Sequence, residues 1–111
     1  MSNAESSIRV TICNQKGLHA RASAKFIKTV GAYDAKVQVS RVNWTGLAEG
    51  SECYGPVNGS SLLGLMLLAA DNGTEIQISA SGNQSSEVLQ ALTELIENKF
   101  GEDINAQEHK A

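Results

Sequence analysis

The chain has 111 residues, of which 41% are hydrophobic and 19% are charged, and its formal net charge is −3. These values predict one small globular domain, and the absence of a basic excess argues against nucleic-acid binding. Two cysteines far apart in sequence exclude a disulfide framework and favour a reducing compartment.

The termini and the apolar runs bear on location. The first residues do not show a basic start followed by an apolar run, so no signal peptide is predicted. The longest apolar run, residues 62–70, is too short to cross a bilayer. We therefore expect a cytoplasmic protein that does not insert into membranes.

The first half of the chain alternates between strand and helix patterns. Residues 1–7 are polar and are expected to be flexible. Alternation of apolar and polar residues predicts a strand from Ile8 to Cys13, and a loop that ends in glycine follows it. Helical spacing then predicts a helix from Ala20 to Val30, with Gly31 as its stop, and alternation returns in residues 35–40.

The second half continues the same pattern after a polar, glycine-rich turn region. Residues 52–57 form a weaker strand candidate, and Pro56 argues that this strand is short or lies at a sheet edge. A short helix over 62–70, a strand over 76–80 and an amphipathic helix over 88–100 follow, with Gly101 beyond the helix. Residues 102–111 are predicted to be a flexible polar tail.

The order strand, helix, strand, strand, helix, strand, helix indicates one α+β domain over residues 8–101. Strands with a single apolar face need that face covered, and three helices on one side can cover it. The expected architecture is an open-faced sandwich, in which three helices lie on one face of a four-stranded antiparallel sheet.

His19 and Arg21 are the main candidates for chemistry. They follow Gly17, at the predicted start of the first helix. Unpaired backbone N–H groups and the helix dipole favour an anion at such a place, and arginine adds a permanent cation. Neutral imidazole is a competent nucleophile, so a phosphorylated histidine is one interpretation. A capping or surface histidine without chemistry is the alternative.

The segment GLHARASAKFIKTV, residues 17–30, resembles the active-site signature of HPr, the histidine-containing phosphocarrier family of the bacterial phosphotransferase system. Residues 60–66, SSLLGLM, are similar to the regulatory-serine helix of that family. The order of elements matches from about Ile8 to Phe100. The resemblance implies the same fold and a role in phosphoryl transfer.

Individual roles follow from this resemblance. It implies that His19 takes a phosphoryl group on Nδ1 from phospho-enzyme I, ultimately from phosphoenolpyruvate, and passes it to an EIIA-type protein. Arg21 matches the arginine that contacts the phosphate. The chain would then be a carrier rather than a stand-alone enzyme, and we expect a monomer without a cofactor of its own.

The second helix carries two further implied roles, each with a simpler alternative. Ser61 matches the serine that a dedicated HPr kinase phosphorylates in some bacteria, whereas an unmodified helix N-cap requires no kinase. Partner docking is implied for Leu62, Leu63 and Met66, whereas a buried helix is the alternative. A regulatory binding module, controlled by phosphorylation of His19 or Ser61, is therefore the second functional hypothesis.

Two departures from the family pattern stand out. Ala22 replaces the proline of most sugar-transport members. Alanine there resembles the nitrogen-related branch and the HPr proteins of some proteobacteria, whose output is regulatory, and this puts sugar uptake in doubt. The connection Val42–Gly55 is longer than usual and contains Trp44 and Tyr54, which a longer hairpin would explain. Cys13 and Cys53 are expected to be small apolar fillers, and no metal site is predicted.

Overall fold

Four strands and three helices follow one another in the predicted order. The computed structural model describes residues 5–42 and 53–102. The elements are β1 (Glu5–Thr11), α1 (Ala20–Gly31), β2 (Lys36–Val42), β3 (Cys53–Asn58), α2 (Leu62–Leu67), β4 (Glu75–Ser81), α3 (Ser85–Glu97) and a short 3-10 helix, η1 (Lys99–Gly101). Most of the long connection predicted between the second and third strands, including Trp44, lies outside the described residues.

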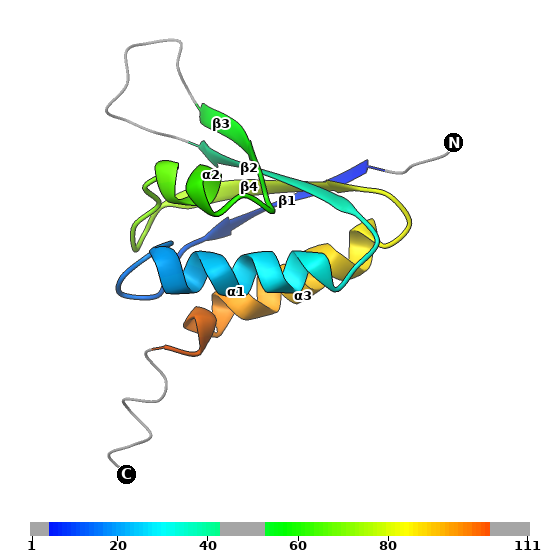
Figure 1. The fold of residues 1–111 in the computed structure, drawn as a ribbon. Coiled ribbons are helices and arrows are strands. Elements are labelled where there is room, and N and C mark those ends of the chain that lie inside the picture. Colours follow the sequence, from blue (N-terminus) through cyan, green and yellow to red (C-terminus); the bar gives the residue numbers. More distant parts are fainter. Residues whose placement is uncertain (1–4, 43–52, 103–111) are drawn as a thin grey trace.

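The four strands form one antiparallel sheet in the order β1-β4-β2-β3 (Figure 1). The central position of β4 is set by its apolar alternation, because Ile76, Ile78 and Ala80 are almost completely buried. Ile78 is paired with Ile8 of β1 on one side and with Val39 of β2 on the other. Pro56 lies in β3, and β3 is an edge strand as predicted.

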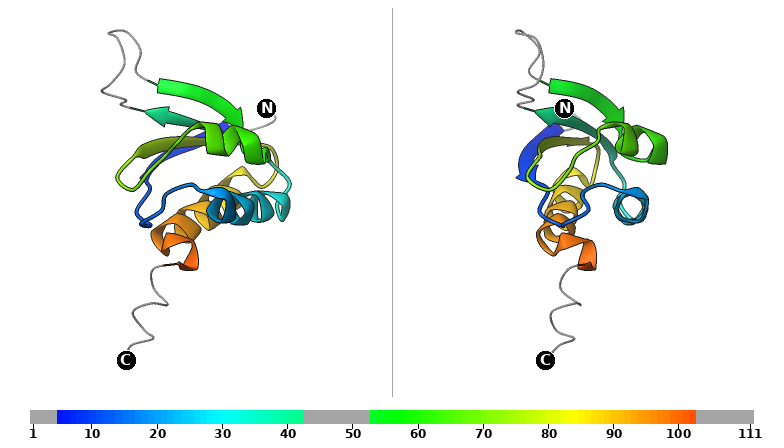
Figure 2. Two further views of the ribbon diagram at one scale, coloured as in Figure 1. Left: turned by 60° about the vertical axis from the view of Figure 1, so that its left-hand side comes forward. Right: turned by 90° about the vertical axis from the view of Figure 1, so that its left-hand side faces the viewer.

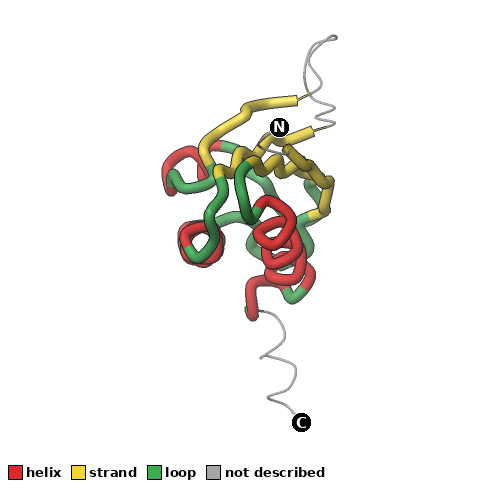
Figure 3. The backbone as a smooth tube through the Cα atoms, turned by 90° about the vertical axis from the view of Figure 1, so that its right-hand side faces the viewer, coloured by secondary structure: helices red, strands yellow, loops and turns green. Residues whose placement is uncertain are grey.

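The helices cover one face of the sheet, which confirms the predicted open-faced sandwich (Figures 2 and 3). α1 and α3 lie side by side across this face, and α2 packs against β3 and α1 (Figure 1). The largest buried apolar side chains between the layers are Ile12, Phe26, Leu65, Leu68, Ile76, Ile78, Leu92, Ile96 and Phe100. Burial of these side chains from both layers fixes each helix on the sheet.

β1 begins at Glu5, three residues before the predicted start at Ile8. Glu5–Ser7 pair with Ser81–Ser79 of β4, so part of the segment expected to be flexible belongs to the sheet. These residues are polar and give no apolar alternation, which is why the sequence did not indicate the longer strand. The backbone ladder with β4 extends the strand regardless of side-chain polarity.

α2 ends at Leu67, before the predicted end at Ala70. Ala69 has a φ of 50°, in the left-handed region, which terminates the helix. Arg41 Nη1 then donates to the carbonyl oxygens of Leu68 and Ala69 at 3.0 and 2.7 Å. These bonds satisfy carbonyl groups at the helix end. α1 differs in the other direction, since it includes Gly31, the predicted stop.

The C-terminal end of α3 also differs from the prediction, because the helix ends at Glu97 rather than at Phe100. Lys99 and Phe100 have φ values of 56° and 55°, and η1 turns the chain back toward α1. The turn buries the Phe100 ring, which is only 1% exposed. Glu102, assigned by the sequence to the tail, is thereby brought over the start of α1.

The loop before α1 crosses the segment after α2 at Gly17. Leu18 N–H donates to the Ala70 carbonyl oxygen at 2.9 Å. Gly17 has a φ of +69°, and a Cβ at this position would lie 2.4 Å from the Ala70 oxygen and 2.8 Å from Asp71 Cα. Only glycine fits this crossing without a shift of the backbone.

We predict that Gly17→Ala lowers the free energy of unfolding by about 2–4 kcal/mol, because a left-handed backbone cost and a clash act together. Urea denaturation measures this loss. Gly73→Ala is the matched control: Gly73 has a φ of +94°, but nothing lies within 4 Å of its added Cβ. The control should lose only about 1–2 kcal/mol, and equal losses in the two variants would contradict the clash.

Candidate functional site

His19 is the N-cap of α1. Its backbone is extended, with φ −83° and ψ −176°, and its carbonyl oxygen accepts from Ser23 N–H at 2.8 Å. The ring Nδ1 accepts from Arg21 N–H at 3.3 Å. The imidazole thus does what a serine or aspartate oxygen does at most helix starts, which is to satisfy one of the unpaired first-turn donors.

The other ring nitrogen faces a carboxylate. His19 Nε2 lies 2.7 Å from Oε2 of Glu102, and the two side chains are 29% and 14% exposed. A backbone N–H can only donate, so Nδ1 presents its lone pair to Arg21. In the neutral ring the proton is then on Nε2, where it is donated to Glu102. The contacts of both nitrogens therefore agree on one tautomer.

Two further residues hold Glu102 in place. Asn14 is completely buried, and its Nδ2 donates to Oε1 of Glu102 at 3.0 Å and to the Gly17 carbonyl oxygen at 2.9 Å. Lys25 Nζ donates to the Phe100 carbonyl oxygen at 2.7 Å, which joins η1 to α1. The sequence analysis did not identify Asn14 or Glu102 as site residues. Gly101, next to Phe100 at the end of the predicted last helix, was the one local signal of a turn at this point.

A surface pocket of about 620 Å³ opens beside the imidazole. It is lined by Gln15, Lys16, His19, Ala20, Arg21, Lys25, Gly101 and Glu102. The structure therefore brings His19 and Arg21 together, as predicted, and adds two lysines. Three cationic side chains and one carboxylate around a helix N-terminus suit a small anion of high charge.

Ala22 does not face this pocket. Its side chain is completely buried and belongs to the core, whereas Ala20 and Ala24 are exposed. The N–H groups of Ala20, Arg21 and Ala22 belong to the first turn, where α-helices have no acceptor of their own.

Ser61 and the predicted docking residues lie on α2, outside the His19 pocket. Ser61 is the N-cap, and its Oγ accepts from Gly64 N–H at 3.0 Å. Leu62, Leu63 and Met66 are 44%, 67% and 42% exposed, and the neighbouring Leu67 is 57% exposed. Leu65 and Leu68 are completely buried, so α2 is buried on one side only.

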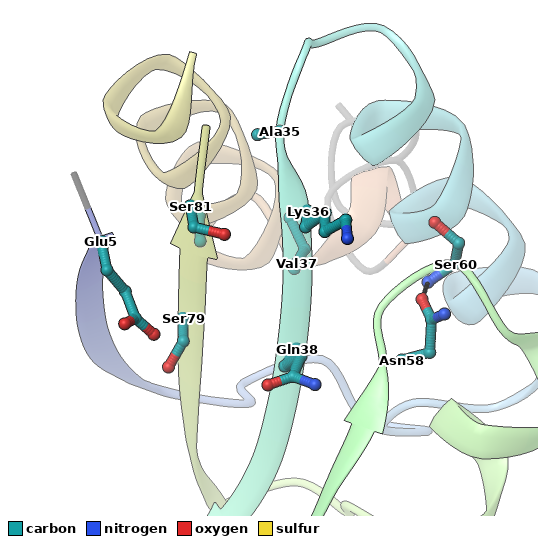
Figure 4. A pocket seen from close by; sticks show the side chains of 10 residues that line it. Glu5, Ala35, Lys36, Val37, Gln38, Asn58, Ser60, Ser79 and Ser81 are labelled. Carbon is teal, nitrogen blue, oxygen red and sulfur yellow. Dashed lines mark hydrogen bonds between the residues drawn. The ribbon is translucent and has the colours of Figure 1, made fainter. Parts of the chain in front are cut away.

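Other parts of the described chain offer less chemistry. A second pocket of about 470 Å³ lies over polar side chains of the sheet, including Glu5, Lys36, Gln38, Ser79 and Ser81 (Figure 4), and neither histidine nor arginine lines it. Cys13 Sγ donates to the Ile96 carbonyl oxygen at 3.2 Å and packs beside α3. Within residues 5–42 and 53–102, no three His, Cys, Asp or Glu side chains gather as metal ligands.

The helices of the described residues are also too short or too polar to span a membrane.

Comparison with known proteins adds an independent line of argument. The sequence model of the PTS-HPr family, described as "PTS HPr component phosphorylation site", matches residues 6–98. The chain is 41% identical to the phosphocarrier protein HPr of Pseudomonas aeruginosa over 95 residues, covering 86% of this chain and 94% of the relative. It is 40% identical to HPr of Neisseria meningitidis over 93 residues, covering 84% and 92% of the two chains.

Solved structures of HPr proteins superimpose on this chain. The crystal structure of HPr-C-His from Thermoanaerobacter tengcongensis superimposes with a TM-score of 0.71 at 32% identity, covering 88% of this chain and 98% of the other. The crystal structure of HPr from Bacillus anthracis superimposes with a TM-score of 0.67 at 27% identity, covering 84% of this chain and 98% of the other. The matched family, the fold and the histidine at the helix start agree, and the chain belongs to the HPr family of phosphotransferase-system phosphocarriers.

Proposed function

We propose that Nδ1 of His19 accepts a phosphoryl group from phospho-enzyme I and passes it to an EIIA-type acceptor. The observation that carries this proposal is the hydrogen bond from Arg21 N–H to Nδ1, because it places a nitrogen lone pair at the N-terminus of α1. Family membership supports phosphoryl transfer as the chemistry. The donor and the acceptor follow from the family resemblance of the signature around His19.

In the forward step the lone pair of Nδ1 attacks phosphorus, and a nitrogen–phosphorus bond forms as the bond to the donor breaks. Nδ1 can then no longer accept from Arg21 N–H. That donor, together with the first-turn N–H groups of Ala20 and Ala22, becomes free to bind phosphoryl oxygens. The lone-pair contact of the resting state thus becomes an anion site in the product.

The energies involved suit a carrier. A phosphorylated side chain carries a charge of roughly −1.5 to −2, and a helix N-terminus stabilises such a charge by about 0.3–1 kcal/mol. The Arg21 side chain adds charge-assisted hydrogen bonds. These modest contributions hold the phosphoryl group without trapping it, so that an acceptor can remove it.

The proposal also covers the location of the protein, its oligomeric state and its metabolic output. We place it in the cytoplasm as a monomer, where both partners of a phosphotransfer chain would reach it. Ala22 stands where sugar-transport members carry proline, and this favours a regulatory output in nitrogen or carbon metabolism over sugar uptake. The carrier requires no cofactor, because the donor supplies the phosphoryl group.

A second role, as a regulatory binding module, rests on the exposed side of α2. Leu62, Leu63 and Met66 present an apolar surface next to Ser61. Exposed apolar groups of this kind on a small domain indicate a protein partner, and methionine adapts to several partners. Phosphorylation of Ser61 by an HPr kinase would put negative charge at the edge of this surface and weaken docking.

His19→Ala should abolish formation of an acid-labile phosphoprotein with phosphoenolpyruvate and enzyme I. The reason is that no other side chain presents a nucleophilic nitrogen at a helix start in the described residues. Radiolabelled phosphoenolpyruvate and acid treatment measure the product. His109→Ala is the matched control, because His109 is the other histidine of the chain and should leave labelling unchanged. Persistent labelling of His19→Ala would overturn the proposal.

Arg21→Ala should slow phosphorylation of His19 by roughly 10-fold or more, because a charge-assisted contact contributes about 1.5–3 kcal/mol. Label on the protein, measured after quenching at successive times with limiting enzyme I, gives the phosphorylation rate. Arg21→Lys keeps the positive charge but loses the planar guanidinium group, so its phosphorylation rate should lie between those of the unaltered protein and Arg21→Ala. An Arg21→Ala rate equal to that of the unaltered protein would exclude the phosphate contact.

Ser61→Asp should leave folding intact while weakening enzyme I binding several-fold. Aspartate is also a good N-cap, so the helix start is retained and only the charge changes. Ser61→Ala removes the cap at a cost of about 1 kcal/mol but adds no charge. Titration calorimetry against enzyme I should therefore separate the two variants, and equal affinity of Ser61→Asp and the unaltered protein would argue against regulation at this serine.

A further inference from the structure

We propose that Glu102 is a positioning residue that holds the proton of His19 on Nε2 and so keeps Nδ1 open for the phosphoryl group. The effect of Glu102 on phosphoryl transfer rests on the proposed function. Its effect on which ring nitrogen of His19 carries the proton does not. Glu102 lies beyond residues 6–98, the part of the chain that matches the family model, so the match does not assign it a role.

The two hydrogen bonds of the ring differ in strength. The contact between Nδ1 and Arg21 N–H is 3.3 Å long, at the outer end of the usual range. The contact between Nε2 and Glu102 is 2.7 Å long and involves a carboxylate, and such charge-assisted bonds are shorter and stronger than neutral ones. The carboxylate therefore has the larger influence on which nitrogen carries the proton.

The position of the carboxylate is itself fixed from several sides. Oε1 accepts from the buried Asn14, which is also bonded to the Gly17 carbonyl oxygen. The backbone before Glu102 is anchored by the buried Phe100 ring and by Lys25 Nζ on the Phe100 carbonyl oxygen. With a side chain only 14% exposed, Glu102 is partly shielded from water. A carboxylate held in this way can orient a histidine, as it does in catalytic triads and metal sites.

Glu102 also has a consequence for the transfer step. When Nδ1 bonds to phosphorus and the bond to the donor breaks, with its electron pair leaving on the donor, the proton stays on Nε2 and the ring gains positive charge. Glu102 offsets that charge. In the reverse sense, the nitrogen–phosphorus bond breaks and its electron pair returns to Nδ1. Glu102 acts through the ring and does not touch the phosphoryl group.

The test uses the full chain labelled with ¹⁵N in histidine. Long-range proton–nitrogen spectra identify the tautomer of the neutral His19 ring, and labelled phosphoenolpyruvate with enzyme I gives the phosphorylation rate. We expect the unaltered protein to show the Nε2–H form. Glu102→Ala should shift the ring signals toward a mixture of tautomers and slow phosphorylation roughly 10- to 100-fold.

Two variants sharpen the test. Glu102→Gln keeps the size of the side chain but leaves one acceptor oxygen for two donors, Asn14 Nδ2–H and His19 Nε2–H, so the Nε2–H form should lose population and phosphorylation should slow relative to the unaltered protein. Glu97→Ala makes the same change in net charge on the exposed side of α3, and both readouts should stay unchanged.

The outcomes are separable. Ring signals of Glu102→Ala identical to those of the unaltered protein overturn the inference. If the unaltered protein takes no label on His19, the proposed function fails instead. The ring spectra still decide the role of Glu102 in that case.

Discussion

The packing of α1 on the sheet is the constraint on which the site depends. Ala22, Phe26 and Val30 recur every four residues and are almost fully buried, so one face of α1 is fixed against the core. That contact sets both the direction of the helix and the place where it begins. His19 therefore lies at a fixed helix start, where its two ring nitrogens contact Arg21 N–H and Glu102. The place of this histidine is set by buried residues further along the helix, since Ala20 and Arg21 beside it are exposed.

The same core also determines where the C-terminal end of the described chain lies. Leu92 and Ile96 fix α3 beside α1, and the buried Phe100 ring draws the following turn inward. The turn requires two residues in the left-handed region, a local cost that burial of an aromatic side chain outweighs. A carboxylate 83 positions away in sequence thus reaches the imidazole. Packing energy, rather than attraction between the two side chains, accounts for this proximity.

The sequence was sufficient wherever the controlling interactions are local or periodic. Alternation in β4 predicted that strand, since Ile76, Ile78 and Ala80 form its buried face. Helical spacing of apolar residues from Ala20 to Val30 predicted α1, although Ala20 and Ala24 are exposed and the buried face includes Ala22 and Phe26 instead. His19 and Arg21 could be found because they are neighbours on one helical turn. Glu102 and Asn14 could not, because a turn of unusual backbone geometry brings them together. The sequence did not predict the early end of α2 for a similar reason. The guanidinium of Arg41, which is distant in sequence, and the left-handed backbone of Ala69 interrupt an otherwise continuous apolar run.

The segment after α2 forms the physical connection between the exposed apolar helix and the histidine. The Ala70 carbonyl oxygen accepts from Leu18 N–H, one residue before His19, and Asn72 Nδ2 donates to the Asn14 carbonyl oxygen at 3.2 Å. Asn14 in turn bonds to Glu102. A partner that shifted the end of α2 would therefore act on the loop that carries His19 and on the residue that holds its carboxylate. The proposed docking surface and the proposed phosphorylation site lie on different parts of the molecule, but a short series of hydrogen bonds through Ala70, Asn72 and Asn14 connects them.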